Sequence, residues 1–161
     1  MKAREFPFFL ALALLGGCAT TSSVNVPAGA PVRANVLVPL QAIALAADAA
    51  PVGVRGVFEL QVLASGRQGA YLYLNSEADY RDQRCLTIEI APDAVRQLEA
   101  EHGNPLPEFF QGRHIRVAGE AIRTKIFFSH NGRVTEKYYY QTHVRVTDPA
   151  QIEWVEGWAR R

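Results

Sequence analysis

The amino-acid sequence predicts a mainly β domain, a small five-stranded Greek-key barrel with one helix between its third and fourth strands. Three observations predict this fold class. After Val54, apolar and polar residues alternate in several short segments, as they do in strands that bury one face. One helical pattern interrupts these segments between Pro92 and Gly103. The dipeptide Asn131-Gly132 is typical of a two-residue hairpin turn and joins the last two strands.

Three strands are expected before the helix. In the first strand the inward side chains are Val54, Phe58, Leu60, Val62 and Ala64. Residues 65–69 form a turn, and the inward side chains of the second strand are Ala70, Leu72 and Leu74. Those of the third strand are Leu86, Ile88 and Ile90. Cys85 has the opposite parity, so we expect its side chain to lie off the main core.

The helix and two longer strands complete the barrel. Proline is favoured in the first turn of a helix and glycine just past its end, so the helix should run from Pro92 to Gly103. The inward residues of the fourth strand, 112–118, are Ile115 and Val117. The later apolar positions are Ile122, Ile126 and Phe128. This change of parity after Gly119 predicts a β-bulge at that glycine.

The order of these elements matches the OB-fold, a small Greek-key barrel. The motifs that resemble bacterial OB-like modules are Leu74-Asn75, Asp79-Tyr80-Arg81, Gly112-Arg113-His114-Ile115-Arg116-Val117-Ala118-Gly119 and Asp148-Pro149-Ala150-Gln151-Ile152. Some of these modules are relatives of the thermonuclease barrel. The resemblance covers residues 54–155 and implies the fold. Thermonucleases carry an aspartate-threonine-proline-glutamate segment that this sequence lacks, so nuclease activity is not implied.

The first 18 residues have the pattern of a secretory signal. Lys2 and Arg4 precede an apolar run over residues 8–15, which is too short to span a bilayer. The run ends in Leu15-Gly16-Gly17-Cys18, which resembles the lipobox of bacterial lipoproteins. The resemblance implies cleavage before Cys18 and its acylation, with chains such as palmitate, to form a membrane anchor. Because residue 19 is alanine, it also implies the periplasmic face of the outer membrane of a Gram-negative envelope.

The chain therefore divides into three parts. Residues 1–17 are the signal peptide, 18–52 are the lipidated cysteine and a flexible tether, and 53–161 are the OB-like domain. Within the tether, residues 36–50 are compatible with a short helix or an extended segment.

Removal of the signal peptide changes the charge and the cysteine content. The 17 basic and 16 acidic residues lose Lys2, Arg4 and Glu5, which leaves 15 of each. This balance argues against a nucleic-acid partner. Cys85 becomes the remaining free thiol, and we expect it to be inert; a mixed disulfide or a Cys85–Cys85 dimer is the alternative.

No catalytic, metal or cofactor site is expected. Oxygen ligands gather in the loop after the second strand, but Tyr80 stands where a calcium loop needs glycine, so we expect ion pairs with Arg81 and Arg84 instead. The four histidines lack the paired spacing of a zinc site. No serine lies in a G-x-S-x-G context. The protein is therefore interpreted as a non-enzyme.

The terminal hairpin carries the candidate ligand-binding residues. Centring the register on Asn131-Gly132 places Lys125 opposite Tyr138 and Arg123 opposite Tyr140, all on one face. The other face is expected to be core. Residues 110–145 hold seven basic and two acidic side chains, which favours an anion. The alternative is ordinary packing of cations on aromatic rings. Val144 shares the parity of Tyr140, so either a second bulge intervenes or the face assignment fails.

These observations predict a non-catalytic, lipid-anchored envelope protein that acts as a binding or assembly accessory in the periplasm. Its partners are the membrane, through Cys18, and an envelope protein or polymer. The alternative is an OB-fold binder of an anionic small molecule or oligomer through Arg123, Lys125, Tyr138 and Tyr140. An unrecognised hydrolase or nuclease is the remote alternative.

Overall fold

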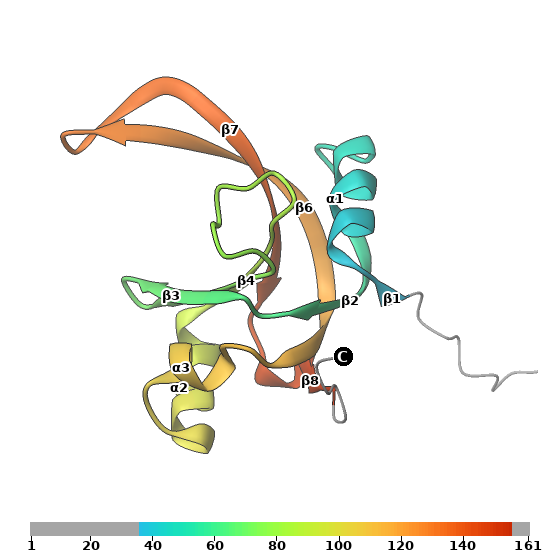
Figure 1. The fold of residues 1–161 in the computed structure, drawn as a ribbon, viewed down its shortest axis with the longest axis vertical. Coiled ribbons are helices and arrows are strands. Elements are labelled where there is room, and N and C mark those ends of the chain that lie inside the picture. The colour runs from blue at the N-terminus through green and yellow to red at the C-terminus, as the bar shows by residue number, and fades with distance from the viewer. Residues whose placement is uncertain (1–35, 156–161) are drawn as a thin grey trace, which may run out of the picture. The chain divides into compact units, whose positions relative to one another are not determined.

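One mixed sheet of eight strands dominates the residues that the structure describes, 36–155 of this computed structural model (Figure 1). Strands account for 49% and helices for 24% of these residues, so the prediction of a mainly β protein is confirmed. The predicted signal peptide and Cys18 lie outside the described residues. The elements are β1 (Val36–Leu37), α1 (Pro39–Asp48), β2 (Val54–Gln61), β3 (Ala64–Gln68), β4 (Tyr71–Asn75), β5 (Leu86–Ile90), α2 (Pro92–His102), α3 (Leu106–Phe110), β6 (His114–His130), β7 (Arg133–Val146), η1 (Pro149–Gln151) and β8 (Ile152–Trp154).

The strand order in the sheet is β1-β2-β6-β7-β5-β4-β3, and β8 also pairs with β6. The pairs β1–β2 and β5–β7 are parallel, and the other pairs are antiparallel. The chain passes from β2 to β3, near opposite ends of this order, through Val62 and Leu63 alone. Although β2 and β3 are adjacent in the sequence, β2 therefore pairs with β6 and β3 pairs with β4.

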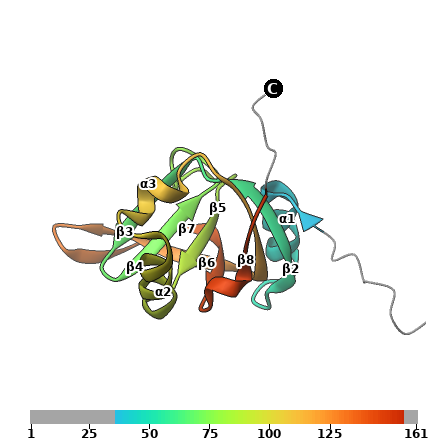
Figure 2. The same cartoon turned by 90° about the horizontal axis from the view of Figure 1, so that it is seen from below.

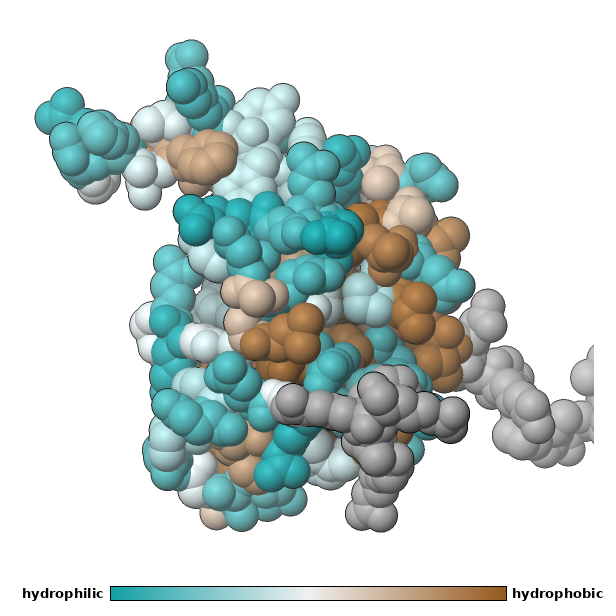
Figure 3. Space-filling view, in the orientation of Figure 1, coloured by the Kyte–Doolittle hydropathy of each residue, from teal (hydrophilic) through white to brown (hydrophobic). Residues whose placement is uncertain are grey.

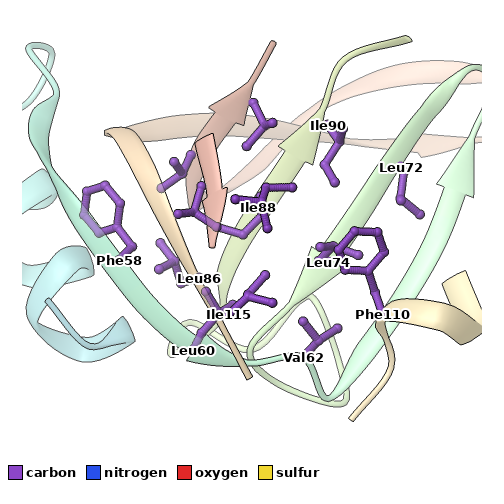
Figure 4. Close-up of a cluster of buried hydrophobic side chains, with 14 of the residues drawn as sticks. Phe58, Leu60, Val62, Leu72, Leu74, Leu86, Ile88, Ile90, Phe110 and Ile115 are labelled. Carbon is purple, nitrogen blue, oxygen red and sulfur yellow. The ribbon is translucent and has the colours of Figure 1, made fainter. Parts of the chain in front are cut away.

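The buried face of the sheet confirms the predicted parities of β2, β4, β5 and the first part of β6, residues 115–117. Ala70, also expected to point inward, is exposed. Figure 4 shows the resulting cluster, in which Phe110 from α3 packs with the side chains of the strands. The predicted inward residues with at most 2% exposure are Phe58, Leu60, Val62, Leu72, Leu74, Leu86, Ile88, Ile90, Ile115 and Val117. Cys85 is buried but lies outside this apolar cluster, with its Sγ 3.8 Å from Asn75 Oδ1.

The folded unit begins before the expected boundary at residue 53. Residues 36–50, for which helix and extended chain were both open, form β1 and α1. Pro39 starts the helix, and the Val38 N–H donates to Gln41 Oε1 at 3.2 Å. Ala42 and Ala46 are fully buried, because their small side chains let the helix pack closely on the core. This segment therefore belongs to the domain rather than to the tether.

Two helices, rather than the expected one, lie between β5 and β6. The first, α2, starts at Pro92 and ends before Gly103, whose φ of 77° suits glycine. The second, α3, has five residues and buries Leu106 and Phe110. Leu106 and Phe110 are four residues apart, one helical turn, and such a short segment gives too little periodicity to predict from sequence.

The bulge predicted at Gly119 is wrong. The pairing of β2 with β6 runs without interruption from Val54–Ala121 to Gln61–His114. Gly119 continues the inward parity, and Ala121 after it is fully buried. A Cβ at Gly119 would lie 2.8 Å from Val144 Cγ1, so this glycine allows β6 and β7 to pack closely. The irregularity in β6 lies instead between Phe127 and Ser129.

Candidate functional site

Beyond the body of the sheet, β6 and β7 continue as a two-stranded arm, which we define as residues 122–141. The pairing of β2 with β6 ends at Ala121, and the pairing of β5 with β7 begins at Thr142. Within the described part of the chain, the strands of the arm are thus paired only with each other. Figure 1 and Figure 2 both show the arm extending away from the other strands.

The turn of the arm confirms the hairpin prediction. Asn131 and Gly132 have φ values of 50° and 73°, the left-handed conformation that an Asn-Gly turn supplies. The register predicted from this turn is wrong by two residues. Lys125 pairs with Tyr140 and Phe127 with Tyr138, because β7 holds three residues, 135–137, where β6 holds only Phe128. A shift of two residues preserves the face on which each side chain lies.

The four predicted residues therefore come together despite the shift. The Arg123 guanidinium carbon lies 3.9 Å from the centre of the Tyr140 ring, and Lys125 Nζ lies 4.3 Å from that of Tyr138. The two tyrosine rings are 5.6 Å apart and meet edge to face. Phe127, which the sequence analysis did not single out, adds a third ring 6.0 Å from Tyr138. We call these five residues the aromatic–cationic surface.

The aromatic–cationic surface is open to solvent. The exposed fractions of Phe127, Tyr138 and Tyr140 are 50%, 49% and 37%. Among the described residues, neither Arg123 nor Lys125 forms an ion pair with a carboxylate. Both cations therefore lie on aromatic rings with their charge available to an external anion.

The face assignment made from the sequence is wrong. Arg123, Lys125 and Tyr140 lie on the same face as Ala121 and Val144, which are fully buried, and no register shift intervenes. The face that is core at the base of the sheet becomes solvent-exposed in the arm, because no other element of residues 36–155 covers it there.

The opposite face, expected to be core, is instead partly open. Ile122 and Phe128 on it are 40% and 46% exposed.

The loop between β4 and β5 contacts the base of the arm through a hydrogen bond. Gln141 Nε2 donates to the Tyr80 carbonyl at 2.7 Å. The predicted ion pairs of this loop are present, with Arg81 Nε 3.1 Å from Asp79 Oδ1 and an Arg84 nitrogen 2.8 Å from Asp82 Oδ2. Hydrogen bonds from Arg84 lower the pKa of the Asp82 carboxyl to about 2. The described residues contain no group of three or more His, Cys, Asp or Glu that could hold a metal ion.

The structure also contains a cluster of polar side chains that the sequence analysis did not predict. On the face of the sheet opposite the core, Glu89 lies between His143 and Arg145, with His143 Nδ1 3.4 Å and Arg145 Nε 3.8 Å from its carboxylate oxygens. His143 Nε2 is 2.8 Å from Gln141 Oε1. Burial lowers the pKa of His143, and the nearby Glu89 carboxylate offsets part of this effect.

These residues were missed because a parallel pair brings them together. Glu89 pairs with Tyr73 on one side and with Arg145 on the other. The β5–β7 pair joins residues more than 50 positions apart in the sequence, and no local sequence pattern predicts such a parallel pairing. The available signal was parity alone, since Tyr73 and Glu89 alternate with the inward residues of their strands.

Comparisons with known proteins do not assign this chain to a family. No protein-family model matches it, and no curated protein matches it. Among solved structures, it is similar to a protein from Leishmania major Friedlin assigned as an aspartyl-tRNA synthetase, with a TM-score of 0.42 and 11% identity. The match covers 80% of this chain and 22% of that one. No helix in the described residues is long and apolar enough to cross a membrane.

Proposed function

We propose that this chain is a non-catalytic, lipid-anchored protein of the bacterial envelope that binds a partner through its arm. The observation that carries the proposal is the aromatic–cationic surface. It projects on two strands beyond the rest of the sheet and contributes nothing to the buried core. Tyrosine and arginine are enriched among the residues that dominate binding energy at protein interfaces. The partner is an envelope protein or a polymer associated with the peptidoglycan.

The position of the arm agrees with an OB-like Greek-key barrel. In this reading β2 and β3 are halves of one strand, and β4, β5, β6 and β7 are the other four. At the junction of the halves, the Val62 N–H donates to Arg113 O and the Leu63 N–H donates to Asn75 O, both at 2.9 Å. The junction thus forms hydrogen bonds both to the segment just before β6 and to β4. The arm then takes the place of the loop between the last two strands, where OB-folds commonly contact ligands.

The anchor and the location rest on the sequence. The Leu15-Gly16-Gly17-Cys18 motif supports acylation of Cys18, and Ala19 supports the periplasmic face of the outer membrane. Two or more acyl chains hold a protein stably at a membrane, whereas one chain binds reversibly. A membrane-held domain meets its partner within a thin layer, which favours modest binding surfaces such as this arm.

A second candidate function is binding of an anionic small molecule or oligomer by the same four residues, Arg123, Lys125, Tyr138 and Tyr140. The two cations without carboxylate partners favour it, because their charge is not neutralised within the described domain. Rings beside cations stack and neutralise anionic ligands in OB-folds. Such binding weakens as salt concentration rises, since it depends on exposed charges.

Crosslinking of the lipidated protein in membranes, followed by mass spectrometry, tests both functions. Phe127→Ser with Tyr138→Ser should reduce recovery of a dominant partner about tenfold or more, because truncation of an aromatic residue at the centre of an interface costs about 2 kcal/mol or more. Tyr71→Ser, outside the arm, is the control and should retain the partner. The same spectra report the mass of acylated Cys18.

The outcomes separate the candidates. Equal recovery of the partner by both variants would contradict binding through the arm. Recovery of no partner, with salt-sensitive anion binding that Arg123→Ala and Lys125→Ala reduce together, would support the second function. Arg96→Ala, which removes an exposed cation that is 69% accessible and lies outside the arm, is the matched charge control.

A further inference from the structure

The exposed large apolar side chains of the described domain fall mainly into two groups. One group belongs to the arm. The other lies at the N-terminal side of the domain and consists of Val36, Val38, Leu40, Leu45 and Val52, with exposed fractions of 40%, 47%, 59%, 42% and 68%. We call it the N-terminal apolar patch. Figure 3 shows apolar surface gathered over β1 and α1. Exposed apolar side chains that gather on one side of a domain commonly mark a surface that contacts a protein or a membrane.

We propose that the N-terminal apolar patch rests on the membrane interface, so that the domain lies against the bilayer. The bilayer is the surface to which the chain leads. Cys18 precedes Val36 by 18 residues, and a segment of that length spans at most about 60 Å when fully extended. The inference rests on the proposed function for the anchor at Cys18, and it adds an orientation of the domain that the anchor alone does not impose.

The chemistry of the segment suits an uncharged interface. Residues 36–54 contain one ionisable side chain, Asp48, and no lysine or arginine. Insertion of the part of this surface formed by β1 and α1 among lipid headgroups therefore desolvates few charges, and the Glu120 side chain beside Gly53 marks the edge of the patch. The absence of basic residues distinguishes the patch from helices that are attracted to anionic lipids. Its occupant is thus a zwitterionic lipid surface, bound by apolar contact.

The packing of α1 leaves these side chains free to face the bilayer. The helix docks on the domain through its two fully buried alanines, Ala42 and Ala46. Its larger residues Leu40 and Leu45 point away from the core and are exposed. A helix that existed only to cover the sheet would bury its large side chains and expose its small or polar ones.

A depth-sensitive fluorescent probe tests the orientation. The acylated full-length protein is placed on phosphatidylcholine vesicles with a thiol-reactive fluorophore at Leu40→Cys. Cys18 is blocked by lipid and Cys85 is buried, so the label goes to the new thiol. Brominated acyl chains should quench the label about twofold, because interfacial residues reach the boundary of the acyl region. A label at Gln68→Cys, in the exposed β3–β4 hairpin, should remain unquenched.

Two further measurements define what would overturn the proposal. Leu45→Gln with Val52→Gln should reduce the quenched fraction of the label at position 40 about threefold, because the apolar contact is weakened. Addition of about 0.5 M salt to the unsubstituted protein should leave that fraction unchanged, because apolar contact is not screened by ions. Equal quenching of the labels at positions 40 and 68 on vesicles would contradict docking. A label at position 40 that is shielded from solvent without lipid, because two copies of the chain associate, would also contradict it. An unacylated Cys18 in the mass spectrum would instead contradict the anchor on which the proposed function depends.

Discussion

His143 is a largely buried imidazole, with 13% of its side chain exposed, whose neighbours lie on β4, β5 and β7. Its ring is 6.4 Å from the Tyr73 ring, and its two nitrogens face Glu89 and Gln141. Burial disfavours the charged imidazolium, so the pKa of His143 is lowered in the folded protein. The unfolded chain therefore takes up a proton at this residue at higher pH than the folded one, so the contribution of His143 to the free energy of unfolding falls as the solution is acidified.

We predict that His143→Gln reduces this acid sensitivity. The wild-type free energy of unfolding should decline once pH falls below about 6.5, the ordinary pKa of histidine, and continue to decline down to the lower pKa of the folded state. Glutamine keeps hydrogen-bonding groups in the same place but does not titrate. Urea unfolding at pH 7.5 and 5.5 measures the difference, with His130→Gln in the exposed turn as the control. Equal losses in wild type and His143→Gln would contradict the prediction.

Among the elements, β2, β4, β5 and the hairpin turn could be predicted because their signals are local. Residues 65–68, expected in a turn, belong instead to strand β3. The alternation of Leu72, Leu74 and their equivalents gives the buried face, and Asn131-Gly132 gives the turn. The register of the arm could not be predicted, because the two additional residues in β7 have no counterpart in the apolar pattern. The exposed side of the arm was misassigned because alternation shows which residues share a face, and neighbouring elements decide which face is buried.

The junction of β6 with β7 provides a prediction at the same scale. Gly119→Ala should lower the free energy of unfolding by about 1–3 kcal/mol, because the new methyl group would meet Val144 Cγ1 at 2.8 Å in a packed interior. Gly66→Ala in β3 is the matched control, since a Cβ there meets no atom within 4 Å. It should change stability by less than about 0.5 kcal/mol. Chemical denaturation of both variants measures the contrast, and equal losses would contradict close packing at Gly119.

In the whole domain, most exposed apolar residues lie on two separate surfaces, the N-terminal apolar patch and the arm. The N-terminal apolar patch lies on β1, α1 and the segment that follows α1, and the arm is formed by β6 and β7 (Figure 1). If the domain rests on lipid through the first surface, as we propose, the arm is the surface that remains for a partner. The sequence predicts the anchor and four of the five residues of the aromatic–cationic surface, but the patch becomes visible only when α1 is seen to bury its alanines.

Site-specific photocrosslinking in intact cells is the measurement that tests the proposed function most directly. A photoreactive phenylalanine analogue is placed at Phe127, whose ring is 50% exposed, and in a separate strain at Tyr71 on β4 as the control. If the arm binds an envelope partner, irradiation should produce one dominant adduct from position 127 and none from position 71. Adducts of equal yield from both positions, or from neither, would contradict the assignment of the arm as the binding surface.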